Sequence, residues 1–211
     1  MATQEAPAPA APRAAKPKKS FLAFRLAHDE FAFASRRAWR IVPSLSRVGF
    51  DATSTLHDFS GVTSRLHGEL EADLAHPDKA PRGAIVVDAK TLDTGLEDRN
   101  AEMYDYLATK EHPEIRFEVV GFEAAKVDVD GMKVEGKVKG RMSIRGVTKD
   151  VDMPVVLAVD SSHRLSIEGE APLDITDYEV PVPSKLGLIG MDKGVKVWIR
   201  LRARLVPRSE G

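Results

Sequence analysis

Residues 132–144, MKVEGKVKGRMSI, alternate between apolar and polar positions along their whole length. Successive side chains of a β-strand point to opposite faces, so a period of two predicts a strand with one wet face and one apolar face. The polar face holds Lys133, Glu135, Lys137, Lys139, Arg141 and Ser143, and the other face holds Met132, Val134, Gly136, Val138, Gly140, Met142 and Ile144.

Two glycines on the apolar face of this strand need an explanation, because a strand glycine buries little surface and costs backbone entropy. The residues alone leave two explanations open. Gly136 and Gly140 bend a long coiled strand, or they leave space for a bound ligand.

The same alternation recurs along the chain, in LHGELEAD, EIRFEV, VDMPVVLAV and VKVWIRLRARL. Together with WRIV, SRVGFDAT, GAIVVDAK and RLSIEGEAPLDI, these stretches predict about eight or nine strands separated by Gly, Asp and Pro turns. One helix is expected over EDRNAEMYDYLA, with Asp93 or Thr94 as its N-cap and acidic residues in its first turn.

An open sheet of amphipathic strands has edges that invite aggregation, and closure removes them. We therefore predict an all-β fold, a closed antiparallel β-barrel of about eight strands with one short helix. The interior of such a barrel is either filled by side chains or holds one small ligand.

Composition excludes several classes of partner. The 31 basic and 32 acidic residues nearly cancel, which disfavours nucleic acid and anionic membrane surfaces as partners. The chain contains no cysteine, and its six histidines show no paired metal-ligand spacing, so we expect no metal and no cofactor. Nucleophile elbows, P-loops and nucleotide fingerprints are absent from the sequence, and no catalytic residue is predicted.

The N-terminal stretch MATQEAPAPAAPRAAKPKKS is rich in Ala, Pro and Lys, which predicts a disordered tail. We assign residues 1–37 to this tail and its connecting segment, and residues 38–207 to the barrel domain. The stretch FLAFRLAHDEFAF is interrupted by charges, so no signal peptide is expected and the predicted location is the cytoplasm. Its phenylalanines suit a short amphipathic segment on the barrel or on a membrane surface, without stable insertion.

Four motifs in register carry a resemblance to a known family: WRIVPSLSRVGF, LDTGLEDRN, KEHPEIRFE and GRMSIRGVTKDVDMPV. Their order and spacing resemble those of the YceI-like family of lipid-binding and polyisoprenoid-binding barrels, over about residues 39–205. The resemblance implies a lipocalin-like barrel whose elongated apolar pore takes an isoprenoid or fatty-acyl chain. Glu102 stands where many members have His, the segment TDYEVPVPSKLGLIGMD departs from the usual ending, and members of the family are often exported.

The resemblance favours the ligand space over the bend as the main role of Gly136 and Gly140, with bending as a concurrent effect. Arg99 and Asn100, in the helix motif, are candidates for binding a ligand's phosphate or carboxylate at the mouth; the alternative is a surface pair between Arg99 and Glu102 or Glu97. The predicted ligand-binding residues are Val48, Phe50, Leu70, Arg99, Asn100, Phe117, Met132, Val134, Gly136, Val138, Gly140, Met142 and Leu157.

Three functional hypotheses follow from the sequence. The first is a carrier of a hydrophobic chain, the second is a hydrolase or isomerase acting in the same cavity, and the third is a filled barrel that binds a partner protein. The sequence favours the carrier and leaves the oligomeric state open.

Overall fold

The computed structural model describes residues 36–185 and 189–207 of the chain. The predicted tail lies outside the described residues except for Arg36 and Arg37, and the phenylalanine-rich segment lies outside them entirely. Arg37 begins the first strand, one residue before the predicted start of the barrel domain.

Long antiparallel strands make up most of the described residues. In chain order they are β1 (Arg37–Ile41), β2 (Arg47–Ser54), β3 (Phe59–Thr63), β4 (Leu66–Ala72), β5 (Arg82–Asp88), β6 (Glu114–Asp128), β7 (Lys133–Ile144), β8 (Val147–Val159), β9 (Arg164–Asp174), β10 (Ser184–Lys185) and β11 (Ile189–Leu205).

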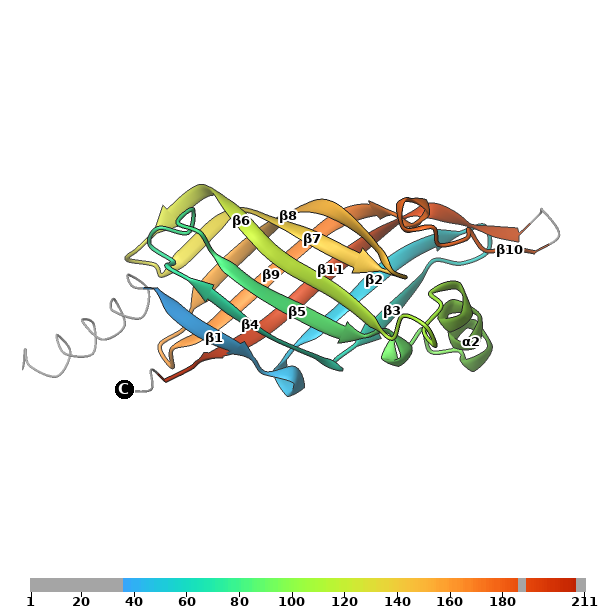
Figure 1. The fold of residues 1–211 in the computed structure, drawn as a ribbon, viewed down its shortest axis with the longest axis horizontal. Coiled ribbons are helices and arrows are strands. Elements are labelled where there is room, and N and C mark those ends of the chain that lie inside the picture. The colour runs from blue at the N-terminus through green and yellow to red at the C-terminus, as the bar shows by residue number, and fades with distance from the viewer. Residues whose placement is uncertain (1–35, 186–188, 208–211) are drawn as a thin grey trace, which may run out of the picture.

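Within the described residues, eight of these strands close into a ring in the order β1, β4, β5, β6, β7, β8, β9 and β11, and β11 pairs again with β1. The hairpin β2–β3 extends the wall beside β11, and β10 pairs with the start of β11. Figure 1 shows the elongated barrel with the helix α2 (Glu97–Tyr106) at one end. The predicted class, a closed antiparallel β-barrel with one short helix, is confirmed.

A short 3-10 helix, Pro43–Leu45, interrupts the wall between β1 and β2. Proline has no N–H to donate to a neighbouring strand, so a strand cannot run through it without losing a ladder hydrogen bond. Ser46 replaces the lost pairing, because its Oγ accepts from the N–H of Arg202 at 3.0 Å and donates to the carbonyl of Val42 at 2.8 Å. The side chain is buried, and an apolar residue at this position would lose both of these hydrogen bonds to the backbone.

Burial along β11 confirms the predicted faces of the last strand. Leu201 and Ala203 are almost fully buried, whereas Arg202 points outward and pairs with Glu168 at 3.0 Å. Lys196 of β11 similarly forms an ion pair with Asp51 of the neighbouring strand β2 on the outer face. Because the side chains alternate, each strand contributes one row to the interior and one row to a surface of exposed ion pairs.

Helix α2 begins at Glu97, and its acidic first turn agrees with the sequence. The predicted N-cap is wrong: Leu96 occupies that position, and no side chain caps the helix. Gly95 adopts a φ of 79°, which turns the chain before the helix and carries Thr94 away from the cap position. The Thr94 N–H and hydroxyl donate instead to Asn100 Oδ1, at 2.8 and 2.7 Å.

Candidate functional site

The interior of the barrel contains a cavity of about 570 Å³. This volume lies within the range of about 300–1,000 Å³ that is usual for small-molecule sites. Inward-facing side chains of the barrel strands and one face of α2 form the lining, which is mainly apolar. The barrel interior is therefore not completely filled by its own side chains.

Two clusters of buried side chains lie along the barrel, and the cavity is bordered by members of both. One cluster centres on Trp39, Leu74 and Leu201. The other lies toward α2 and contains Tyr178, Val180 and Met142.

Eight of the thirteen predicted ligand-binding residues border the cavity. Seven are apolar residues of the barrel strands, and the eighth is an arginine of α2: Val48, Phe50, Leu70, Phe117, Val138, Met142, Leu157 and Arg99. Their contact with a ligand stays a prediction.

The remaining five predicted residues do not border the cavity. Val134 is fully buried in a side-chain cluster, and Met132 packs against that cluster from the β6–β7 turn with a φ of 49°. Asn100 stabilises the loop before α2: its Oδ1 accepts from Thr94, and its side-chain amide donates to Asp93 Oδ1 at 2.8 Å. Gly136 and Gly140 complete the group.

Phenylalanine rings occupy the space in front of both β7 glycines. A Cβ at Gly140 would overlap the ring of Phe117, and a Cβ at Gly136 would overlap the ring of Phe122. Phe117 pairs with Met142 and Phe122 with Val138 across the β6–β7 ladder, so each ring leans over the neighbouring glycine. The glycines therefore do not border an open void themselves; they make room for two rings that do border the cavity.

Helix α2 presents one face to the cavity. Arg99, Glu102, Met103 and Tyr106 recur at intervals of three and four residues, which places them on the same side of a helix. This face contains both apolar and charged groups, unlike the strand lining between the two ends of the barrel.

Arg99 is held in place by neutral groups. Its Nε donates to the Thr94 hydroxyl at 3.0 Å, and its Nη2 donates to the Thr94 carbonyl at 2.8 Å. The guanidinium lies over the ring of Phe59, 4.3 Å from the ring centroid, as in a cation–π contact. The predicted alternative of a surface pair between Arg99 and Glu97 or Glu102 is not observed in the described structure.

Most lining residues were not among the predicted ones, and two of them, Phe59 and Tyr178, bear on the chemistry of the site. Phe59 lies in the short strand β3, where few residues alternate, and Tyr178 ends the 3-10 helix Ile175–Tyr178, where a period of two does not apply. Tyr178 is 2% exposed, and its hydroxyl has no hydrogen-bond partner among the described residues. Burial, with a smaller effect of Asp177, raises the pKa of Tyr178 to about 12.

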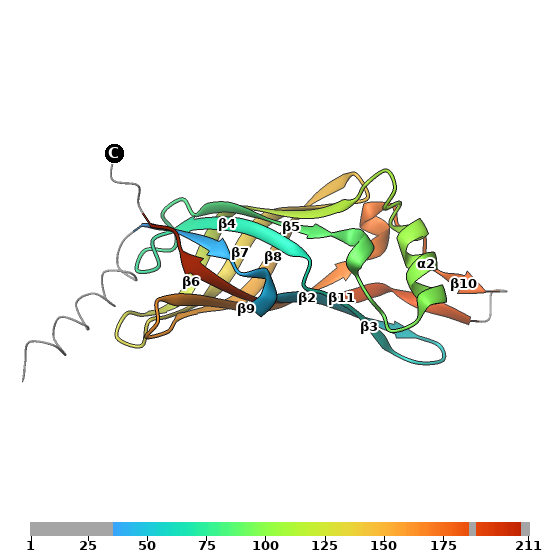
Figure 2. The same cartoon turned by 90° about the horizontal axis from the view of Figure 1, so that it is seen from below.

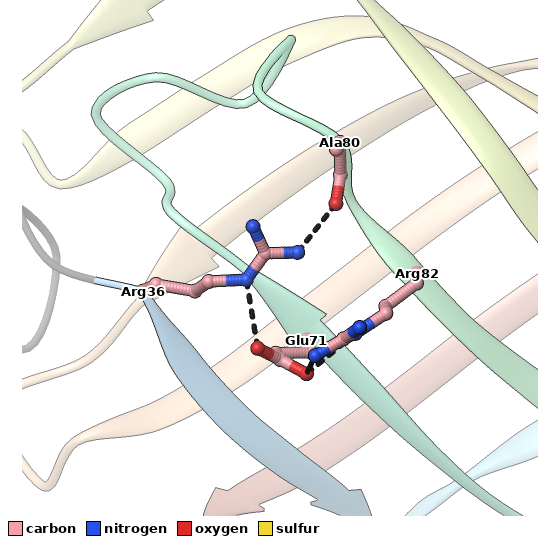
Figure 3. Close-up of polar contacts among 4 residues, drawn as sticks. All are labelled: Arg36, Glu71, Ala80 and Arg82. Atoms are coloured by element: carbon pink, nitrogen blue, oxygen red, sulfur yellow. Dashed lines mark hydrogen bonds and ion pairs between the residues drawn. The ribbon is translucent and has the colours of Figure 1, made fainter.

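The opposite end of the cavity lies beside the segment that joins β4 to β5, residues 73–81. Figure 3 shows that Arg36 and Arg82 share the carboxylate of Glu71, each at 2.7 Å, and that Arg36 also donates to the carbonyl of Ala80. The hydrogen bond from Arg82 is the main cause of a lowered pKa at Glu71, with Arg36 adding to it. Here the positive charges have a protein carboxylate as their partner.

Within residues 36–185 and 189–207, no group of three or more His, Asp or Glu side chains is arranged to hold a metal ion. In the same part of the chain, no helix has the length and apolar character needed to cross a membrane.

The fold and the cavity define a barrel protein with an internal apolar site. Residues 39–203 match the YceI-like domain, so the chain belongs to the YceI-like family, as the sequence motifs predicted. Among curated proteins, none matches the chain.

Solved structures of bacterial proteins share the fold. The crystal structure of BcnA from Burkholderia cenocepacia is 18% identical, with a TM-score of 0.64, and the match covers 77% of this chain and 98% of that one. A polyisoprenoid binding domain from Saccharophagus degradans is 17% identical, with a TM-score of 0.62 and coverage of 81% and 99%. The YceI protein of Campylobacter jejuni is 14% identical, with a TM-score of 0.52 and coverage of 74% and 85%.

Proposed function

We propose that this protein binds one hydrophobic chain, an isoprenoid or a fatty-acyl chain, inside the barrel and carries or sequesters it. The cavity of about 570 Å³ with its mainly apolar lining is the observation that supports this function. Removing apolar surface from water contributes about 25 cal/mol per Å², so a chain that fills such a cavity gains affinity along its whole length.

The shape of the lining supports an elongated ligand. Leu74 and Pro77 border the cavity at the β4–β5 end, and Met103 and Tyr106 border it at the α2 end. A polyisoprenoid ligand is named for the Saccharophagus degradans domain, which has the same fold. Because side chains do not fill the barrel interior, the cavity also argues against the hypothesis of a filled barrel that acts only through a partner protein.

Native mass spectrometry of the protein purified from its host tests the proposal directly. We expect an additional mass that is released into organic solvent, and its fragmentation identifies the chain. A protein that is free of any apolar ligand, and that also fails to take up a fluorescent fatty-acid or polyprenyl probe, would contradict the proposal.

Two adjacent valines of β6 provide a matched pair of variants. Val119 borders the cavity, whereas Val120 is 54% exposed on the outer face. We expect Val119→Trp to reduce probe uptake strongly, because the new side chain occupies ligand volume, and Val120→Trp to leave uptake unchanged. Thermal melting of both variants shows whether the barrel remains folded. Equal uptake by the two folded variants would place the ligand outside the barrel.

A further inference from the structure

The electrostatic surroundings of Arg99 differ from those of several other arginines in this barrel. Six others each pair with a glutamate on the surface: Arg36, Arg40, Arg82, Arg116, Arg141 and Arg202. Arg99 is half-buried at the cavity, and among the described residues its hydrogen bonds go only to the neutral groups of Thr94. Within the described part of the chain, its charge therefore has no carboxylate in direct contact.

A half-buried charge without a counter-ion loses part of its hydration and gains little in return. The two hydrogen bonds to Thr94 and the ring of Phe59 fix the guanidinium in one orientation. An arginine that is held by neutral partners is prepared to bind an anion, because no protein carboxylate competes for it and little side-chain entropy remains to be lost.

Tyr178 provides a second and independent observation. It also borders the cavity, it is 98% buried, and its hydroxyl lacks a partner among the described residues. A buried hydroxyl without a partner costs stability, and such groups are uncommon in native proteins. With a pKa of about 12, this hydroxyl keeps its proton at neutral pH and can act as a donor.

Both residues lie at the same end of the barrel. Helix α2, which contains Arg99, and the 3-10 helix that ends with Tyr178 appear together at the α2 end in both ribbon views (Figures 1 and 2). Phe59, over which Arg99 stacks, packs against the buried cluster to which Tyr178 belongs. Two hydrogen-bond donors therefore border the mainly apolar cavity at this end.

We propose that the ligand has an anionic oxygen-bearing head group, a carboxylate or a phosphate, and that this head binds at the α2 end through Arg99 and Tyr178. The inference rests on the proposed function, and it adds the class of head group and the direction in which the ligand lies. The apolar chain then extends from α2 toward the β4–β5 end, where both arginines are already paired with Glu71.

Glu102 borders the same part of the cavity, one turn after Arg99, and its side chain is exposed. A carboxylate at this position repels an anionic head group and does not affect an apolar chain. Its removal by Glu102→Gln is therefore expected to tighten binding of an anionic ligand and to leave a neutral ligand of the same chain length unaffected.

The test compares ligands that share a chain and differ in the head. Binding of farnesyl phosphate and farnesol, and of palmitate and hexadecanol, is measured by competition with a fluorescent probe on the full-length protein. We expect at least one anionic ligand to bind about tenfold or more tightly than its alcohol, since a hydrogen bond to a charged group contributes at least that factor. The phosphate and carboxylate pairs show which of the two heads is preferred.

Arg99→Gln is expected to abolish this preference while the alcohols bind as before. Arg200→Gln is the matched control, because Arg200 also stacks on an aromatic ring, Trp198, but is itself exposed and does not border the cavity. Tyr178→Phe removes only the hydroxyl, and we expect it to weaken binding of the anionic ligand several-fold without lowering the melting temperature of the free protein.

The outcomes separate the two proposals. Alcohols and anions that bind with equal affinity, or a preference that survives in both Arg99→Gln and Tyr178→Phe, would overturn the head-group assignment and leave the chain-binding function intact. Failure of all four ligands and of the probe to bind would instead contradict the function itself. Should Arg99→Gln not fold, Tyr178→Phe still decides the question, because the Tyr178 hydroxyl has no hydrogen-bond partner among the described residues.

Discussion

The two ends of the barrel use arginine in different ways. At the β4–β5 end, Arg36 and Arg82 donate to the carboxylate of Glu71, so the positive charge is largely satisfied within the protein (Figure 3). At the α2 end, Arg99 is bound to Thr94 and stacked on Phe59, and no carboxylate pairs with it in the described structure. One end therefore has arginines with a protein carboxylate as partner, and the other end holds the arginine on which the proposed head-group site rests.

Apolar residues differ between the two ends as well. Leu74, in the β4–β5 segment, is 1% exposed and belongs to a buried cluster, whereas Leu56, in the β2–β3 segment, is 61% exposed although it borders the cavity. Burial of a leucine side chain stabilises a fold by about 1.5–3 kcal/mol, so only the first of these residues contributes substantially to the stability of its end.

The largest expected effect concerns this pair of leucines. Leu74→Ala should lower the free energy of unfolding by about 2–5 kcal/mol, because it removes buried surface and leaves a cavity. Leu56→Ala should change it little, since the side chain is already exposed. Urea denaturation of both variants measures the difference. Equal losses of unfolding free energy would show that the two leucines contribute equally to stability.

Substitutions at the two glycines of β7 test the packing of the two buried side-chain clusters. Phe117, over Gly140, packs against the cluster near α2, and Phe122, over Gly136, packs against the other cluster. Alanine at either glycine should cost about 1–3 kcal/mol, because the new Cβ overlaps a ring and also a backbone carbonyl of β6, that of Glu118 or Glu123.

The control for these variants is Gly194→Ala, which is expected to be neutral because a Cβ there meets no atom within 4 Å. A smaller side chain in place of the ring restores space, so Phe117→Leu should recover part of the loss in Gly140→Ala. Neutral effects of both alanine substitutions, measured by thermal melting, would mean that the glycines do not serve the packing of the rings.

The smallest expected effect is a pH dependence confined to the α2 end. Asp174 caps the 3-10 helix that ends with Tyr178, since its Oδ1 accepts from the Thr176 N–H at 3.0 Å. The hydrogen bond from Lys193 is the main cause that lowers the pKa of Asp174 from 3.8 to about 2, and the hydrogen bonds from Thr176 add to it.

Because the pKa of Asp174 is lower in the folded protein, its contribution to stability is present above about pH 3.8 and is lost as the pH falls toward 2. The Asp174→Asn variant should therefore differ from the wild type at neutral pH and approach it in this acidic range. Urea denaturation across that range, with near-ultraviolet circular dichroism of the tyrosines as a local signal, provides the measurement. A constant difference at every pH would contradict this role.

Much of the fold follows from local patterns. The period of two placed Leu201 inside and Arg202 outside, and it gave the faces of β6 and β7 correctly, because alternation is a property of the strand itself. The start of α2 was also close to the prediction, but its cap was not, since Gly95 redirects the chain and Asn100 bonds back to Thr94 from six residues away.

The site was predictable only in part. Val48, Leu70 and Leu157 follow from alternation and border the cavity, whereas Val134 has the same pattern and is packed at full burial instead. Periodicity shows that a residue faces inward, but it does not show how far along the barrel the interior stays open. That depends on which side chains meet across the barrel.

The sequence by itself determined the strands, their faces, the closure of the sheet and the family, because each rests on local periodicity or on motifs in a fixed order. Only the tertiary structure decided what lies opposite the glycines of β7, since diagonal neighbours depend on the register between strands. It also decided that Arg99 has neutral partners while Arg82 has a carboxylate. The charge of a side chain is set by its type, but its counter-ion is set by whatever segments the fold brings beside it.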